Sequence, residues 1–354
     1  MTLTAQAVLD VLQPVQDPEL HKSLVDLNMI RNVQVEGGKV SFTLVLTTPS
    51  CPLKTFIIED CERAIKTLPG VESVEVDVTS ETPAQKSAPG RDSVKGVKNI
   101  IAVSSGKGGV GKSTIAVNLA VALAQFGSKV GLIDADIYGP NAPIMLGVGD
   151  AKVAVRQGDQ GEIIEPAFNH GVKVVSMAFL ISPDQPVIWR GPMIDGMVRN
   201  FLYQVEWGEL DYLIVDMPPG TGDAQLTIAQ RVPVAGVVIV TTPQKVALAD
   251  ARRGLKMFEQ LGTKILGIVE NMSYFIPPDQ PDRTYDIFGS EGGQKAAVEL
   301  GVPLLGCVPL EIPVREGGDV GVPIVVSHPN SASAKALVAI AQAVAAKVSI
   351  AALT

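Results

Sequence analysis

The stretch "SSGKGGVGKST", residues 104–114, decides the fold of the larger part of this chain. Residues 106–113 fit the spacing G-x-x-x-x-G-K-[ST] of a phosphate-binding loop. An apolar run precedes the loop and a helical pattern, "STIAVNLAVALAQFG", follows it, which is the strand–loop–helix order of such sites. The stretch therefore predicts a nucleotide-binding loop. The alternative is a glycine-rich turn between a strand and a helix that binds no ligand.

The residue types of the loop suit a metal-bound triphosphate. Its glycines let backbone N–H groups turn inward around a phosphate at the N-terminus of the helix. We expect Lys112 to neutralise the β- and γ-phosphate oxygens and Ser113 to offer its hydroxyl oxygen to Mg²⁺, which favours ATP over a dinucleotide. The predicted nucleotide contacts are Gly106, Lys107, Gly108, Gly109, Val110, Gly111, Lys112, Ser113 and Thr114.

Acidic residues lie at the ends of two further apolar runs. "LIDAD" contains Asp134 and Asp136, and "YLIVDMPPGTGD" contains Asp216 before a Pro/Gly loop that could respond to the γ-phosphate. In P-loop enzymes one such carboxylate holds Mg²⁺ and another orients the attacking water. We expect Asp216 to serve the metal with Asp134 in support, and Asp136 to orient water as a catalytic residue. Asp134 has a simpler alternative role as a helix cap or turn residue.

Short apolar runs separated by helical patterns continue from about residue 98 to the end of the chain. Parallel strands that helices cover on both faces have this pattern, because neither face meets water. Residues 98–354 are therefore predicted to form an α/β domain with a doubly wound, mostly parallel sheet and a ligand at the C-terminal strand ends. The runs are "NIIAVSS", "KVGLIDAD", "VKVVSM", "DYLIVDM", "AGVVIVTT", "KILGIVE" and "PLLGCVP".

A smaller domain is predicted before it. Residues 1–78 contain a helix, a strand, a second helix and an alternating strand, which together indicate a small α+β unit. Residues 79–97 are rich in Ser, Pro, Lys and Gly without an apolar period, and we interpret them as a linker. A chain of 354 residues is long enough for two such domains.

Composition and charge limit the function classes. The net charge of −8 and the lack of a Lys/Arg run give little support to a nucleic-acid-binding surface. The N-terminus lacks the features of a secretory signal, and three cysteines indicate a reducing compartment, so we expect a cytoplasmic protein. The Ala-rich C-terminal stretch is interrupted by Lys335 and Lys347, which favours a packed helix over a membrane span.

The motifs together resemble a known family. "KGGVGKST", "DADIYGPN", "IWRGPM", "DMPPGTGD" and "NMSYF" are similar to those of the Mrp/ApbC iron–sulfur cluster carrier ATPases, which belong with the MinD/ParA P-loop ATPases. The resemblance covers residues 98 to about 325, while residues 1–78, with "DPEL" and "TTPSCP", resemble the MIP-type domain of iron–sulfur assembly factors. It implies an ATP-hydrolysing carrier that transfers [4Fe-4S] clusters from a scaffold protein to recipient apoproteins, without nucleic acid or membrane.

Two further residue roles follow from this resemblance. In the wider class the early lysine of the loop reaches the nucleotide of the other subunit, so Lys107 predicts a homodimer and a catalytic contact across it. An exposed loop lysine is the alternative. Asn271 stands where the family contacts adenine, and its alternative is a buried turn-forming residue. Trp189 and Arg190 match the family motif, but chemistry alone assigns them no role.

The chain departs from the family in its thiols. Most members carry a Cys-x-x-Cys pair after "NMSYF", whereas "NMSYFIPPDQPDRTYDIFG" contains no cysteine. Cys51 precedes a helical segment whose N-terminus would lower a thiol pKa. It also lies in "TTPSCP", which in the related domains contains a reactive or cluster-handling cysteine, so the resemblance implies that role for Cys51; the alternative is a residue that caps the helix. Cys61 and Cys307 fall on apolar positions and are predicted to be buried.

Two other function classes stay open. A MinD/ParA-like positioning ATPase would act through a membrane or DNA, but such proteins use a basic tail or surface that the Ala-rich C-terminus does not offer. The second alternative is a regulator without enzymatic activity, in which ATP only controls assembly.

Overall fold

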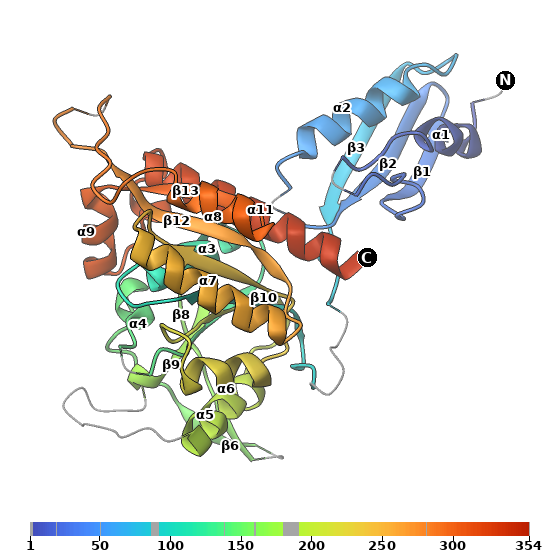
Figure 1. Cartoon of the computed structure of the whole chain (residues 1–354). Helices are drawn as coiled ribbons and strands as arrows, with labels where there is room; N and C mark the ends of the chain where they lie inside the picture. The colour runs from blue at the N-terminus through green and yellow to red at the C-terminus, as the bar shows by residue number, and fades with distance from the viewer. Residues whose placement is uncertain are drawn as a thin grey trace. The chain divides into compact units, whose positions relative to one another are not determined.

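The structure is a computed structural model that describes residues 3–18, 20–49, 51–85, 92–137, 139–158, 161–179, 191–280 and 282–353, with the backbone alone at 191 and 192. Trp189 and Arg190 therefore lie outside the described residues. The chain forms two compact units, drawn in Figure 1. One comprises Met1–Pro83 with Ala345–Thr354, and the other comprises Ala84–Val344.

The first unit is a three-stranded sheet with two helices. Strand order is β1-β2-β3, with β1 antiparallel and β3 parallel to β2. The sequence did not predict β1, because its strand residues are mostly polar and exposed. The elements are α1 (Ala5–Leu12), β1 (Ile30–Glu36), β2 (Lys39–Leu46), α2 (Lys54–Ile65) and β3 (Ser73–Ser80).

Helix α2 shows how the core of this unit forms. Its buried residues Ile57, Cys61 and Ile65 recur every fourth position, which places them on one face of the helix. They pack with Phe42 and Leu44 of β2 in a single apolar cluster. The last residues of the chain also join this unit, and the Ser349 hydroxyl donates a hydrogen bond to the Thr47 carbonyl at 3.2 Å.

The second unit confirms the predicted α/β sheet. Its strand order is β13-β12-β11-β4-β10-β5-β9-β8, and every neighbouring pair is parallel except β8 with β9. The winding reverses at β4, which is where a ligand is expected in such a sheet. Its strands are β4 (Val97–Ser105), β5 (Val130–Asp134), β8 (Ala167–Asn169), β9 (Val172–Ser176), β10 (Leu210–Asp216), β11 (Gly236–Thr241), β12 (Ile265–Phe275) and β13 (Leu304–Leu310), and β6 (Val155–Gly158) pairs with β7 (Gly161–Ile164) apart from it.

Helices lie on both faces of this sheet, as Figure 1 shows. Ile100 and Ala102 of β4 pack with α5–α8, whereas Ile101 and Val103 point to the opposite face and are equally buried. This double burial explains the continuous apolar runs. The helices are α3 (Lys112–Gln125), α4 (Ala142–Met145), α5 (Gly191–Tyr203), α6 (Asp223–Arg231), α7 (Lys245–Gln260), α8 (Gly292–Leu300), α9 (Ile312–Val320), α10 (Ile324–Ser327) and α11 (Ala332–Leu353), with a short 3-10 turn at Met177–Phe179.

Helix α11 is the Ala-rich C-terminal stretch. By length and composition it could cross a membrane, with a mean hydropathy of 2.0, yet 44% of its most apolar window is buried within the protein. Leu337, Ile340, Val344 and Val348 are buried along its length. The structure therefore buries these apolar side chains, as a packed helix requires.

Candidate functional site

The phosphate-binding loop joins β4 to α3. Gly109 and Gly111 have φ angles of 77° and 80°, the left-handed region that glycine adopts most readily. A side chain at Gly111 would overlap the Asn271 amide, and one at Gly106 would overlap the backbone of α7 at Asp250. The glycines are therefore needed both for the turn and for close packing around it.

Two carboxylates lie close to the lysine of this loop. Lys112 has a side-chain exposure of 6%, and its Nζ lies 2.6 Å from Oδ1 of Asp216 and 3.8 Å from Oδ2 of Asp136. Its Nζ also lies 3.3 Å from the Ser113 hydroxyl. Asp216 and Asp134 are direct neighbours on paired strands β10 and β5. The fold thus brings the predicted lysine, serine and acids together at one edge of the sheet.

Asp134 is held by hydrogen bonds at the end of β5. Its carboxylate accepts from the backbone N–H groups of Asp136 at 3.2 Å and Ala142 at 3.1 Å, and from the Ser176 hydroxyl at 3.1 Å. Burial, and secondly the charge of Asp216, raise the pKa of Asp134. These bonds order the chain after β5, so the turn-forming role given as an alternative is present. Asp136 lies beyond the strand rather than within it.

The donor set fits Mg²⁺. Asp216 is fully buried, and its Oδ2 has no hydrogen-bond partner among the described residues. A buried carboxylate oxygen without a partner is costly, and a cation or its bound water would satisfy it. Oxygen atoms, such as those of carboxylate and hydroxyl groups, are the ligands that this ion prefers. Ser113 can supply a hydroxyl oxygen, because that oxygen lies close to the same Lys112 Nζ that contacts Asp216.

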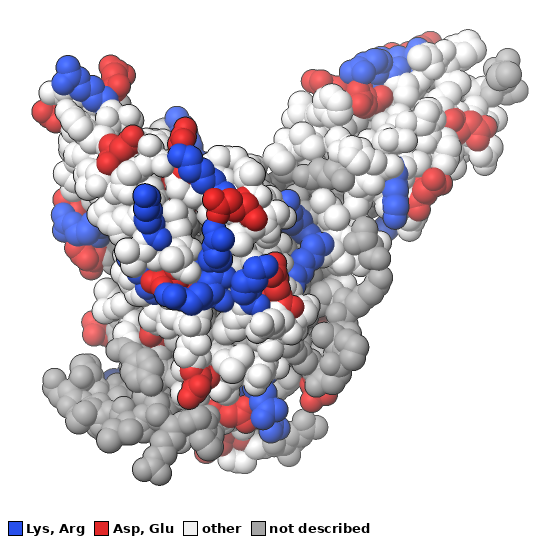
Figure 2. Space-filling view, in the orientation of Figure 1, with Lys and Arg blue, Asp and Glu red and all other residues white. Residues whose placement is uncertain are grey.

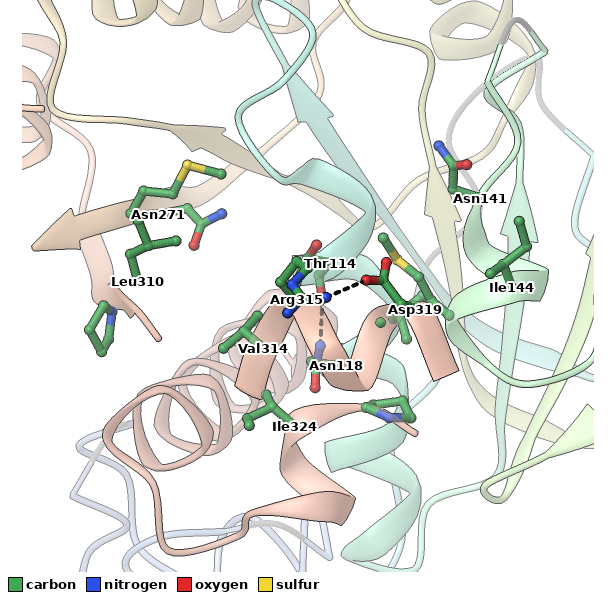
Figure 3. Close-up of a pocket in the computed structure, with 16 residues that line it drawn as sticks. Thr114, Asn118, Asn141, Ile144, Asn271, Leu310, Val314, Arg315, Asp319 and Ile324 are labelled. Carbon is green, nitrogen blue, oxygen red and sulfur yellow. Dashed lines mark hydrogen bonds and ion pairs between the residues drawn. The ribbon is translucent and has the colours of Figure 1, made fainter. Parts of the chain in front are cut away.

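A cavity of about 410 Å³ opens beside the loop, large enough for a nucleoside. Figure 3 shows Asn271 and Leu310 on one side of it, Asn141 and Ile144 on the other, and Thr114 of α3 between them. The Asn271 amide donates to the Val110 carbonyl of the loop at 2.8 Å. The residue expected at the adenine therefore lies on the wall of the cavity and also fixes the loop.

Lys107 contacts the residue at the start of α7. Its Nζ lies 3.4 Å from Oε1 of Gln244, the residue that precedes α7, and its backbone carbonyl accepts from the Ser105 hydroxyl at 2.9 Å. The side chain is half-buried. The described chain therefore brings Lys112 to the carboxylates and leaves Lys107 at the edge of the loop.

Some contacts behind the loop were missed by sequence reasoning. Gln225, in the first turn of α6, is buried and donates to the Ser104 hydroxyl. The Gly220 N–H donates to the Ser105 carbonyl at 3.0 Å, so the Pro/Gly loop after Asp216 is tied to the same strand. A polar residue on the apolar side of α6 was the available signal for Gln225.

The three cysteines have different surroundings. Cys51 is half-buried in the first unit, and the residue that caps α2 is Leu53, so the capping alternative for Cys51 does not hold. Cys61 is fully buried, as predicted, and burial raises the pKa of its thiol to about 12. Cys307 is half-buried rather than buried, and burial followed by the charge of Glu270 raises its pKa.

The segment after "NMSYF" forms a hairpin that projects from β12 (Figure 1). Phe275 and Tyr285 exchange backbone hydrogen bonds of 2.8 and 3.0 Å across its base. Tyr285 and Ile287 are about half exposed. No group of three or more metal-ligating side chains occurs among the described residues, so one chain does not hold a preformed thiolate site.

Comparison with known proteins agrees with this site. The ParA model, described as NUBPL iron-transfer P-loop NTPase, matches residues 96–345, and a model of iron-sulfur cluster assembly proteins matches residues 5–78. An iron-sulfur cluster carrier protein of Synechocystis is 75% identical over 99% of both chains, and one of Deinococcus radiodurans is 47% identical over 97% of this chain and 95% of its own. The solved nucleotide-binding protein of Archaeoglobus fulgidus in complex with ADP is 41% identical, with a TM-score of 0.57 over 64% of this chain and 88% of that chain.

These matches extend over both predicted regions of the chain and include the loop, the acids and the hairpin. The chain belongs to the NUBPL iron-transfer P-loop NTPase family, with an iron-sulfur cluster assembly region at its N-terminus.

Proposed function

We propose that this protein is an ATP-hydrolysing carrier that binds a [4Fe-4S] cluster and transfers it to apoproteins. The observation that carries the proposal is the meeting of Lys112 with Asp216 and Asp136 at the loop, in a chain whose relatives at 75% and 47% identity are named iron-sulfur cluster carriers. The relative of known structure binds ADP, which supports a nucleotide in the same loop.

The residues of the loop have distinct roles in this proposal. ATP would replace the carboxylates as the partner of Lys112, because its β- and γ-phosphates carry the opposing charge. Backbone N–H groups at the start of α3 would hold the phosphates, and the cavity beside Asn271 would hold the base. Ser113 and Asp216, supported by Asp134, would hold Mg²⁺, which would neutralise charge on the phosphates.

Hydrolysis needs a positioned water. Asp136 has a side-chain exposure of 14% and lies next to Lys112, so its carboxylate can orient water toward the γ-phosphorus. The water oxygen forms a bond to that phosphorus as the bond to the β–γ bridging oxygen breaks, which gives ADP and inorganic phosphate. Asp136 accepts the proton that the water loses, or passes it to solvent.

A homodimer completes the site. Lys107 lies at the edge of the loop and contacts Gln244 rather than the carboxylates of its own chain. A second subunit facing the loop would bring its own Lys107 toward the phosphates, where the added charge stabilises the transferring phosphoryl group. Nucleotide would then control whether the dimer is closed.

The cluster is the cargo. With the family thiol pair absent from the hairpin, Cys51 is the candidate ligand that we propose, because Cys61 is fully buried and because burial and the charge of Glu270 raise the pKa of Cys307, which disfavours its thiolate. Cys51 supplies one thiolate per chain, so further ligands would come from a second subunit or from the scaffold and recipient proteins. Free thiols also suit the cytoplasmic setting that we expect.

Anaerobic reconstitution with iron and sulfide tests the cargo. We expect four iron and four sulfide ions per bound cluster, as the [4Fe-4S] composition requires, and a loss of most of this content in Cys51→Ser. Cys61→Ala is the matched control, because it removes a buried thiol and should keep the cluster. A protein that stays colourless, or a Cys51→Ser variant with full iron content, would contradict the proposal.

A further inference from the structure

The outer face of α7 carries a stripe of cations. Lys245, Arg252 and Lys256 recur at positions i, i+7 and i+11, which places them along one side of the helix, and Arg253 lies beside them. All four are exposed, and Figure 2 shows Lys and Arg gathered over this helix. We refer to these four residues as the α7 basic face. It stands out because the whole chain has a net charge of −8.

Internal ion pairs do not use up this charge. Arg252 pairs with Glu299, Arg253 with Asp250, and Lys256 with Glu259 at 2.7 Å, and the side chains in these three pairs are 38% to 70% exposed except Asp250, at 18%. Exposed pairs of this kind contribute little to stability and exchange readily with other anions. Lys245 makes no ion pair with any described residue, so the face can accept carboxylates from outside the chain.

The inner face of α7 touches the nucleotide site. The loop residue Gly106 packs so closely on the α7 backbone that a side chain there would overlap Asp250. A Cβ at Gly254 would lie 4.0 Å from the Cα of Gly106 and 3.9 Å from the methyl group of Thr221, which belongs to the Pro/Gly loop after Asp216. At the start of α7, Gln244 contacts Lys107. One helix thus joins the basic face to both loops expected to respond to ATP.

We propose that the α7 basic face is a docking surface for a carboxylate-rich segment of a protein partner, and that docking there is coupled to nucleotide binding. The coupling rests on the proposed ATP site, whereas the docking does not. A short acidic segment matches a stripe confined to one helix. A long polyanion such as DNA would extend beyond the stripe onto a molecule of net negative charge, which would repel it.

Fluorescence anisotropy with a labelled peptide rich in Asp and Glu tests the docking. The same peptide with Asn and Gln in place of the acids is the probe control. We expect the acidic peptide to bind and the neutral one not to bind. The variant Arg252→Gln/Lys256→Gln should weaken binding about tenfold, since it removes two of the four cations. Lys129→Gln/Lys152→Gln changes the net charge equally at exposed lysines elsewhere and should leave binding unchanged.

Coupling is measured in the same assay with and without ATP. Because the two sites share α7, we expect the peptide affinity to change by about fivefold or more with ATP, and the ATP affinity to change by the same factor with the peptide. Equal binding by the two double variants, or binding of a DNA duplex or of anionic vesicles in place of the peptide, would overturn the docking proposal. A wild-type protein that binds the peptide but hydrolyses no ATP would instead count against the proposed function.

Discussion

The fold builds more of the nucleotide site in the second unit than of a cluster site at Cys51 in the first unit. Around Lys112 the chain supplies a phosphate loop, buried carboxylates at neighbouring strand ends, and a cavity beside the loop. Around Cys51 it supplies one half-buried thiol, and no group of three or more metal-ligating side chains occurs among the described residues. The comparison suggests that the chain is built to use ATP by itself and to hold its cargo only together with another molecule.

The largest loss of activity is expected from a change at the nucleotide site. Lys112→Ala removes the cation that would neutralise the phosphates, and ATP turnover should fall by about 10³-fold or more. Phosphate release measures the turnover. Lys129→Ala, at an exposed position, is the control. If Lys112→Ala kept wild-type turnover with an unchanged fold by circular dichroism, the site would not be where we place it.

A variant at Lys107 tests whether the nucleotide site needs a second subunit for ATP turnover. We expect Lys107→Ala to lower turnover by about 10²-fold, because the charge from the partner is lost. Mixing Lys107→Ala with Lys112→Ala should restore part of the turnover, since the mixed dimer contains one loop with its own Lys112 and a neighbouring Lys107. Turnover no higher than the sum of the two variants would show that Lys107 acts within its own chain.

The cysteines of the first unit provide a stability contrast. Cys61→Ser buries a hydroxyl in an apolar cluster and should lower the free energy of unfolding by about 2 kcal/mol, because no partner for the hydroxyl is at hand. Cys51→Ser alters a half-buried side chain and should change the free energy of unfolding by less than about 0.5 kcal/mol. Urea titration compares the two. A larger loss for Cys51→Ser would mean that this thiol supports the fold rather than the cargo.

The buried acid next to the loop predicts a pH dependence. The pKa of Asp134 is raised in the folded state, so the folded protein binds more protons than the unfolded chain above about pH 4. Without nucleotide, stability should therefore fall as the pH rises from this value toward the raised pKa, by at most about 1.4 kcal/mol per pH unit. Urea titrations at several pH values should show a flatter dependence for Asp134→Asn. An identical dependence in both proteins would mean that Asp134 does not cause it.

Local sequence patterns predicted the fold around the loop, because these patterns are the physical cause of the local strands, turns and helices. The loop spacing, the apolar runs and the acids at strand ends each determine structure within a few residues. Strand β1 was missed because its apolar alternation covers only Val33–Glu36 and an irregularity between Arg31 and Gln34 interrupts the strand before it. The close packing of α7 on Gly106 could not be predicted, because the two segments are more than a hundred residues apart in the sequence. The approach of α7 to Thr221 could not be predicted either, because Thr221 belongs to a separate loop. The half-burial of Cys307 likewise depends on its neighbours in space.

The central claim is that ATP at this loop drives delivery of the cluster. It is tested most directly by cluster transfer from the reconstituted protein to an apoprotein that needs a [4Fe-4S] cluster for its activity. With ATP, the wild type should activate the recipient faster than without it, whereas Lys112→Ala should carry the cluster but show no response to ATP. Wild-type transfer at the same rate with and without ATP would contradict the account.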